Sequence, residues 1–346
     1  MTYLSFVCAA RNDNHGGKFL ERLFKSLESF SRQSEYFKLH TEFLIVEWNP
    51  VKNKKSLQCI IEKKINKNKF CSVRVIRVPE KYHYQLDNSK NLQFFQMIAK
   101  NVGIRRAQGK FILASNIDII LSKSLFEFLA KKKLRPNLMY RSDRFDVKYI
   151  STKNILDDTN SVCKNGNLVR INKKNSHQNI IFIQSLLSLR EIASKKDKLK
   201  RIWKEKMRIL LKRIGIKVKS KYTQHLHACG DFTLLSKNAW NFLRGYPETP
   251  IHSWHLDSIF CIQAHNAGFY EEVLLFPLVH FHQEHQGGFT PESGDRLFKK
   301  LGKRKIPFIQ DEFGAIESHI KGSKQAVVFN NENWGLGNIK LEERIF

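Results

Sequence analysis

The sequence predicts an α/β protein in which a mostly parallel sheet is flanked by helices. Two observations predict this fold class. Apolar runs typical of buried strands alternate with segments of helical spacing along residues 3–121, in the order β-α-β-α-β-α-β. Such alternation is typical of a parallel sheet with helices on both faces. The chain also has 346 residues and is 42% hydrophobic, which is enough for a large core.

Each element has its own signal. Strands are expected at 3–10, 42–48, 71–79 and 110–121, and helices at 18–33, 56–65 and 91–109. In the first helix, apolar residues recur at positions 19, 20, 23, 24, 27 and 30, which lie on one helical face. Asn49-Pro50 ends the second strand, and Gly109 ends the third helix. In the last strand, apolar runs enclose a polar patch that contains Asn116 and Asp118.

The middle of the chain differs in composition. Residues 151–188 are polar and rich in Asn, as expected of a loop, and residues 190–221 contain 14 Lys or Arg against 3 Asp or Glu. Apolar residues of this basic segment share one helical face: Leu199, Ile202, Trp203, Met207, Leu210, Leu211 and Ile214. A basic amphipathic helix of this kind often lies on an anionic membrane surface. The alternative is that its apolar stripe packs on the domain.

Charge and motifs exclude several function classes. With 60 Lys or Arg against 32 Asp or Glu, the net charge of +28 indicates anionic partners: nucleic acid, an acidic membrane surface or phosphorylated small molecules. The six cysteines have no CxxC spacing, which argues for buried thiols in a reducing compartment and against a zinc site. No GxGxxG follows the first strand and no Walker motif occurs, which argues against a Rossmann dehydrogenase and a P-loop enzyme.

The expected location follows from two further observations. The first residues lack the positive leader and the longer apolar stretch of a signal peptide. No stretch reaches the roughly 18 apolar residues of a membrane span. We therefore expect a cytoplasmic protein, which the basic helix could place peripherally on the inner face of the plasma membrane.

Polar side chains follow the predicted strands where ligands usually bind. Arg11 and Asp13 follow the first strand, Glu47 lies at the end of the second, and Asn116 and Asp118 lie in the fourth. In open parallel sheets, ligands bind beyond the carboxyl ends of the strands, so these residues should converge on one crevice. A simple turn is the alternative for Asn116 and Asp118, because both residue types favour turns.

Three stretches resemble a known family. They are AKNVGIRRAQGKFILASNIDII (99–120), GDFTLLSKNAWNFLRGYPE (230–248) and WHLDSIFCIQAHNAGF (254–269). In order and spacing they resemble GT-A-fold, family-2-like glycosyltransferases, in which a helix leads to a strand ending in a DxD motif. The versions GDFTL, RGYPE and HLDS, with the later HxxH, look most like bacterial enzymes of surface-polysaccharide biosynthesis.

The resemblance implies a donor site and a metal site. Donor-binding roles are implied for Arg11, Asp13, Glu47, Asn101, Arg105 and Asn116. Asp118 matches the metal-binding Asp of DxD. His282 or His285 would suit the late His ligand of the family. The alternative is that His280, His282 and His285 are structural or surface histidines. A divalent cation, Mn²⁺ or Mg²⁺, would stabilise the leaving diphosphate. Asn116 replaces the first Asp of the motif, so metal binding should be weak, or Lys and Arg should neutralise the diphosphate instead.

Two carboxylates are candidates for the general base of an inverting transfer. Asp257 matches the catalytic position of the family's E-D motif, although His255 and Leu256 replace the residues before it. Asp231 is the rival base or an acceptor-binding residue. An N-cap role for the following helix is the alternative for Asp257. Trp254 and Trp240 could stack on sugar rings or belong to the core.

These observations predict a glycosyltransferase that moves a hexosyl or related sugar from a nucleotide-sugar donor to a glycan or lipid-linked glycan. Residues 1–150 would bind the donor, 151–221 would form a basic insertion, and 222–346 would complete the same domain with the acceptor side and a C-terminal tail. Alternatives are a nucleotidyltransferase and a protein that binds sugar nucleotides with little or no turnover. A nucleic-acid-binding protein is disfavoured, because only the charge supports it.

Overall fold

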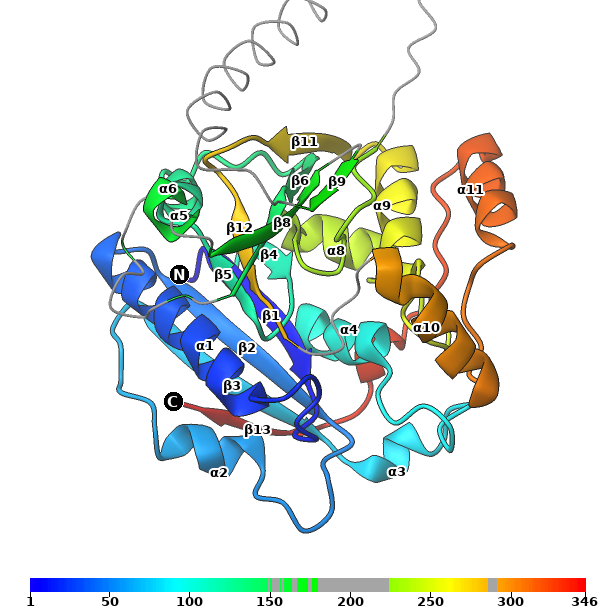
Figure 1. Ribbon diagram of the computed structural model, residues 1–346, viewed down its shortest axis with the longest axis horizontal. Coiled ribbons are helices and arrows are strands. Elements are labelled where there is room, and N and C mark those ends of the chain that lie inside the picture. The colour runs from blue at the N-terminus through cyan, green and yellow to red at the C-terminus, as the bar shows by residue number, and fades with distance from the viewer. Residues whose placement is uncertain are drawn as a thin grey trace, which may run out of the picture.

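The computed structural model describes residues 1–148, 224–285 and 291–346, together with 150, 156, 159–163, 167–173 and 176–179. The basic segment 190–221 lies outside the described residues. The core is an eight-stranded sheet in the order β11-β6-β10-β4-β1-β2-β3-β13 (Figure 1). Its strands are β1 (Leu4–Ala10), β2 (Thr41–Trp48), β3 (Cys71–Val78), β4 (Phe111–Ala114), β6 (Leu138–Ser142), β10 (Thr233–Ser236), β11 (Tyr270–Leu274) and β13 (Glu342–Ile345).

The pairing of these strands confirms the predicted fold class. The central strands β4, β1, β2 and β3 are parallel neighbours, and β11 is parallel to β6. Antiparallel pairs occur where β10 joins β4 and β6 and where β13 joins β3. The carboxyl ends of β1 and β4 therefore meet at one edge of the sheet, the position where such sheets bind ligands.

Helices cover both faces of this sheet. The helices in the described part of the chain are α1 (Phe19–Tyr36), α2 (Leu57–Glu62), α3 (Glu80–His83), α4 (Gln96–Arg106), α5 (Lys123–Ala130), α6 (Thr159–Cys163), α8 (Lys237–Leu243), α9 (Leu256–Asn266), α10 (Pro291–Lys303) and α11 (Phe313–Gly322), with a 3₁₀ turn at Trp334–Leu336. Successive side chains of each strand point to opposite faces of the sheet, so the sheet separates two hydrophobic cores. In β1, Phe6 faces the core shared with α1, α2 and α5, and Val7 faces the core shared with α4, α8 and α9.

A glycine fixes how closely α4 lies on the sheet. A Cβ atom added at Gly103 would lie 2.6 Å from Cγ1 of Val7 and 3.0 Å from Cγ2 of Val46. Only a residue without a side chain allows this approach, which brings the start of α4 to the carboxyl ends of β1 and β4.

The expected strand at 110–121 is wrong in one respect. The structure divides it into β4 and β5 (Ile119–Leu121), which belong to different sheets. The second sheet has the order β5-β12-β7-β8-β9, with β7 (Arg144–Val147), β8 (Leu168–Lys173), β9 (Ser176–Asn179) and β12 (His280–Gln283). Asn116 and Asp118 therefore lie at the crossover between two sheets. The sequence does not show that the two strands pair in different sheets, because the apolar residues on both sides are buried in either sheet.

The last residues of the chain return to the first half of the fold. β13 runs antiparallel along β3, pairing Glu342 with Arg77, and it forms an edge of the sheet (Figure 1). Trp334 is buried in the core that contains α4. In the described part of the chain, no helix is long and apolar enough to span a membrane.

Candidate functional site

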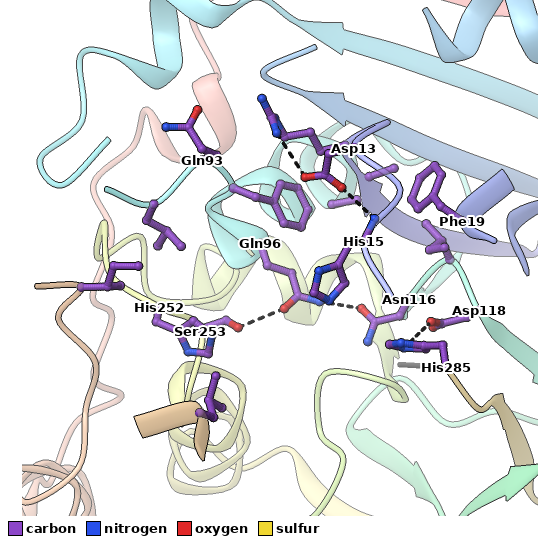
Figure 2. Close-up of a pocket in the computed structure, with 18 of the residues that line it drawn as sticks. Asp13, His15, Phe19, Gln93, Gln96, Asn116, Asp118, His252, Ser253 and His285 are labelled. Atoms are coloured by element: carbon purple, nitrogen blue, oxygen red, sulfur yellow. Dashed lines mark hydrogen bonds and ion pairs between the residues drawn. The ribbon is translucent and has the colours of Figure 1, made fainter. Parts of the chain in front are cut away.

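A cavity of about 580 Å³ opens at the carboxyl ends of β1 and β4. Seven of the residues singled out in the sequence line it: Arg11, Asp13, Asn116, Asp118, Asp231, His282 and His285. Figure 2 shows His285 against Asp118 on one side of the cavity, with His252 and Ser253 on the opposite side. Segments far apart in the sequence thus supply one set of polar side chains.

Asp118 is the centre of the charged side of the cavity. Its Oδ2 atom lies 2.5 Å from Nη1 of Arg22, 3.2 Å from Nε2 of His285 and 3.8 Å from Nε2 of His282. Burial alone would raise the pKa of Asp118, but His282, His285 and Arg22 together hold this pKa well below its usual range. Asp118 is therefore ionised at any physiological pH.

The donor atoms around Asp118 fit a divalent cation. One ligand atom each from Asp118, His282 and His285 lies within 4.8 Å of the others, and the first two residues are buried. A set of one carboxylate and two imidazoles suits Mn²⁺ or a similar transition ion better than Mg²⁺ or Ca²⁺, which prefer oxygen ligands. These are the three residues for which the sequence resemblance implied a role as metal ligands.

A second buried carboxylate lies behind His282. Oδ1 of Asp146, in β7, lies 3.1 Å from Nδ1 of His282 and 2.8 Å from Nε of Arg144. Burial opposes ionisation, but His282, Arg144 and Arg170 lower the pKa of Asp146 to about 2. A carboxylate behind an imidazole orients the ring and makes the other nitrogen a better ligand. Burial lowers the pKa of His282, yet Asp118 and Asp146 raise it overall.

Sequence reasoning missed Arg22 and Asp146. Arg22 lies on the buried side of α1, beside the apolar residues whose spacing predicted the helix, and Asp146 lies in a stretch where no element was expected. A signal does exist in the second case, since Arg144 and Asp146 alternate with the apolar Phe145 and Val147. In a strand, that alternation places two opposite charges on one face.

Asn116 belongs to a chain of hydrogen bonds across the cavity. Its Nδ2 atom donates to Oδ1 of Asp231 at 2.5 Å, and its Oδ1 atom accepts from Nε2 of Gln96 at 2.8 Å. Gln96 in turn accepts from Oγ of Ser253 at 3.0 Å. Nη1 of Arg144 lies 2.8 Å from the other oxygen of Asp231. Burial opposes ionisation of Asp231, but Arg144 and the neighbouring histidines keep its pKa below the usual range.

Arg11 and Asp13 line the cavity beside the end of β1. Nη1 of Arg11 lies 3.1 Å from Oδ2 of Asp13, and Nε of Arg11 donates to the Asn49 carbonyl oxygen at 2.9 Å. The backbone N–H of His15 donates to the other oxygen of Asp13 at 3.1 Å. These bonds give the loop after β1 a defined shape on this wall of the cavity.

Glu47 and Asp257 lie away from the lining of the cavity. Both oxygens of Glu47 accept the Leu57 N–H at 3.1 Å, at the start of α2, and burial raises the pKa of Glu47. Asp257 accepts the N–H groups of Gly230 at 2.6 Å and Ser258 at 2.9 Å. It is the second residue of α9, so it is not the N-cap; that position belongs to His255.

Asn101 and Arg105 also lie elsewhere, against the expectation that they reach a donor. Nδ2 of Asn101 donates to Oε1 of Glu248 at 3.0 Å and to the Tyr246 carbonyl oxygen at 2.8 Å. Arg105 donates to the carbonyl oxygens of Glu332 at 2.6 Å and Trp334 at 2.8 Å. α4 uses these side chains to bind the RGYPE stretch and the C-terminal segment, which are distant in sequence.

Neither tryptophan is placed to stack on a ligand in the cavity. Trp240 is fully buried and stacks on Phe260 with ring centroids 4.4 Å apart. Trp254 contacts Phe298 of α10, with ring centroids 5.2 Å apart. Both are absent from the described lining of the cavity.

The comparisons with known proteins add a distant likeness. No protein family and no curated protein sequence matches the chain. The structure is similar to S. aureus TarS 1-349 in complex with UDP, with a TM-score of 0.46 and 12% identity, covering 92% of this chain and 70% of that chain. The structure is also similar to S. aureus TarS 1-349 in complex with UDP-GlcNAc, with a TM-score of 0.46 and 12% identity. This similarity covers 92% of this chain and 71% of that chain. A likeness this distant assigns no role to any residue here.

Proposed function

We propose that the chain is a glycosyltransferase that binds a nucleotide sugar in this cavity. The sugar would pass to a hydroxyl of a glycan or lipid-linked glycan during surface-polysaccharide synthesis. The observation that carries the proposal is the convergence of Asp118, His282 and His285 on a cavity of about 580 Å³ at the ends of parallel strands. A cavity of this size and position is typical of a small-molecule site.

The donor's diphosphate calls for positive charge in the cavity. Asp118, His282 and His285 would hold a divalent cation, which supplies Lewis-acid stabilisation of a leaving phosphate when bound. Lys300 and Arg304, at the end of α10, line the cavity and are exposed. Neither side chain has an ion pair within the described part of the chain, so both are available to phosphate oxygens. Arg11 lines the same cavity, beside its partner Asp13.

Asp231 is the better placed of the two candidate bases. It lines the cavity, whereas Asp257 accepts two backbone N–H groups away from it. The pKa of Asp231 lies below its usual range, so Asp231 is an ionised carboxylate at neutral pH. A carboxylate has about four acceptor positions, so the bonds from Asn116 and Arg144 leave room for a hydroxyl. Asp231 would bind and orient the acceptor hydroxyl and take its proton.

The bonds to Asp231 also favour a second candidate function. Both oxygens of Asp231 already have partners, Asn116 and Arg144, and the other candidate base lies off the cavity. Such a site could bind a nucleotide sugar and turn it over slowly or not at all. This candidate shares the donor site with the first and differs only in the chemical step.

The basic segment 190–221, which lies outside the described residues, would bring the protein to its acceptor. Its 14 Lys or Arg against 3 Asp or Glu support binding to an anionic membrane, where a lipid-linked acceptor would lie. Cosedimentation of the full chain with vesicles containing anionic lipid tests this part. Binding should weaken as salt increases, and equal binding to neutral vesicles would contradict it.

One experiment tests the function. A panel of nucleotide sugars, UDP-GlcNAc among them, is titrated into wild type, Asp118→Asn, Asp231→Asn and Asp257→Asn, with Mn²⁺ or with chelator, and donor hydrolysis is followed. We expect one donor to bind, Asp118→Asn to lose the Mn²⁺-dependent part of binding, and Asp231→Asn to bind but lose hydrolysis. Binding without hydrolysis in wild type would favour the second candidate. No binding of any donor would reject both.

A further inference from the structure

Arg22 is held at the candidate metal site by several fixed partners. It lies in the first turn of α1, and its side chain is only 7% exposed. The guanidinium donates to the His15 carbonyl oxygen and, at 3.3 Å, to that of Gly17, and its Nη1 atom lies 2.5 Å from Oδ2 of Asp118. Arg22 also lines the cavity, so its positive charge faces both Asp118 and any ligand.

Asp118 uses the same oxygen toward Arg22 and toward both histidines. Oδ2 is the atom nearest to Nε2 of His285, at 3.2 Å, and to Nε2 of His282, at 3.8 Å. A cation bound among these three side chains would therefore meet the Arg22 guanidinium at its carboxylate ligand. Two positive groups cannot share one carboxylate oxygen in a buried site without strong repulsion, since buried charges are poorly screened.

The surrounding charges make this competition sharper. Three buried carboxylates, Asp118, Asp146 and Asp231, face three guanidiniums, those of Arg22, Arg144 and Arg170. These six side chains are thus balanced in charge before a metal adds two positive charges. Arg144 and Arg170 contact Asp146 or Asp231, whereas Arg22 is the guanidinium that pairs with Asp118.

We propose that Arg22 sets the metal affinity of this site by competing with the divalent cation for Oδ2 of Asp118. Metal binding requires the Arg22 guanidinium to turn away from Asp118 into the cavity. There the phosphate oxygens of a ligand can accept its hydrogen bonds. Without such a ligand, Arg22 stays on Asp118 and metal binds weakly. The inference rests on the proposed function only through the metal site at Asp118.

The test is Mn²⁺ binding to the full-length, ligand-free chain, followed by the electron paramagnetic resonance signal of free Mn²⁺. Arg22→Gln removes the competing charge and should bind Mn²⁺ at least about tenfold more tightly than wild type, given the strength of buried charge interactions. Arg22→Lys retains the charge and should stay near wild type. Arg32→Gln, on the same helix but paired with Glu28 on the surface, is the matched control and should bind as wild type does.

The outcomes separate this inference from the function. If Arg22→Gln binds Mn²⁺ no more tightly than wild type, Arg22 merely orients Asp118, and the inference is overturned. If none of the proteins binds Mn²⁺, the metal site itself fails, while nucleotide-sugar binding in chelator would still support the proposed function. Arg22→Met, a second neutral variant with an apolar chain of similar length, replaces Arg22→Gln if the latter does not fold, and the same gain is expected.

Discussion

Nδ2 of Asn116 donates a hydrogen bond to Oδ1 of Asp231, joining the crossover after β4 to the turn before β10. The Oδ1 atom of the same amide accepts from Gln96. An amide can satisfy both neighbours because it offers a donor and an acceptor. A carboxylate could accept from Gln96, but it could not donate to Asp231. The structure thus accounts for an Asn at the position where the resembling family has the first Asp of DxD.

Asn116→Asp should therefore destabilise the protein and bring no gain in metal binding. A half-buried carboxylate would face the buried carboxylate of Asp231 in place of a hydrogen bond, at a cost of about 1–3 kcal/mol in the free energy of unfolding. Urea denaturation near pH 7 measures this cost, with the exposed Asn53→Asp as control. Tighter Mn²⁺ binding by Asn116→Asp would show that position 116 belongs to the metal site after all.

The three histidines of HFHQEH should differ in role, two as metal ligands and one as a structural residue. His282 and His285 face Asp118, whereas His280 stacks on Phe232 with ring centroids 5.5 Å apart and is fully buried. Replacing a ligand with Gln should weaken Mn²⁺ binding by about tenfold or more, because one of three ligands is lost. Calorimetric titration of His282→Gln, His285→Gln and His280→Gln measures this. His280→Gln should change stability alone, and loss of Mn²⁺ binding in that variant would refute the assignment.

Asn101→Ala should affect stability and leave the cavity unchanged. Asn101 is fully buried, and its Oδ1 atom accepts the Tyr246 N–H at 2.9 Å while Nδ2 donates to Glu248. Removing the amide leaves buried polar groups without partners, which costs about 1–3 kcal/mol. Thermal unfolding should show the loss, and donor affinity should match wild type. A folded Asn101→Ala protein that no longer binds the donor would instead restore the donor-binding role implied by the sequence.

Lys100 should give the stability of the protein a distinct pH dependence. Its Nζ atom donates to the Gly230 carbonyl oxygen at 2.7 Å, and burial lowers the pKa of Lys100 to about 8 although Asp231 and Asp257 oppose this. The unfolded chain has the ordinary Lys pKa of about 10.4, so between these two values the unfolded state binds more protons. Stability should therefore rise with pH across this range and be lost as pH falls through 8.

Comparison with Lys100→Met isolates this effect. Denaturation at several pH values should show wild type gaining up to roughly 3 kcal/mol relative to Lys100→Met between pH 8 and about 10. Lys110→Met removes an exposed lysine and should follow the wild-type curve. Parallel curves for wild type and Lys100→Met would contradict the account of Lys100.

The sequence predicted the sheet and one edge of the site because both depend on local patterns. Apolar runs at strand spacing located β1 to β4, and the geometry of parallel strands brought Arg11, Asp13, Asn116 and Asp118 to one cavity. The division of residues 110–121 between two sheets could not be predicted, since pairing partners come from distant segments. His282 and His285 were identified by resemblance, and no local pattern placed them beside Asp118.

The missed and misplaced residues have a common cause. Asn101 and Arg105 were expected at the donor, but they pair with Glu248 and Trp334, which come from segments distant in sequence. Arg22 was overlooked because a charged residue on an amphipathic helix is usually solvated, and its burial results from the loop at 15–17 and from Asp118. In each case, long-range packing decides which polar side chains face the cavity.

Metal binding at Asp118 is tested most directly by the position of Mn²⁺ in crystals grown with the nucleotide sugar that binds, located by anomalous scattering. We expect one strong peak at bonding distance, about 2.0–2.2 Å, from Asp118, His282 and His285, next to the donor's diphosphate. Arg22 should no longer contact Oδ2 of Asp118 in these crystals. A donor bound in the cavity with no metal at Asp118, or Mn²⁺ bound elsewhere, would contradict the central claim.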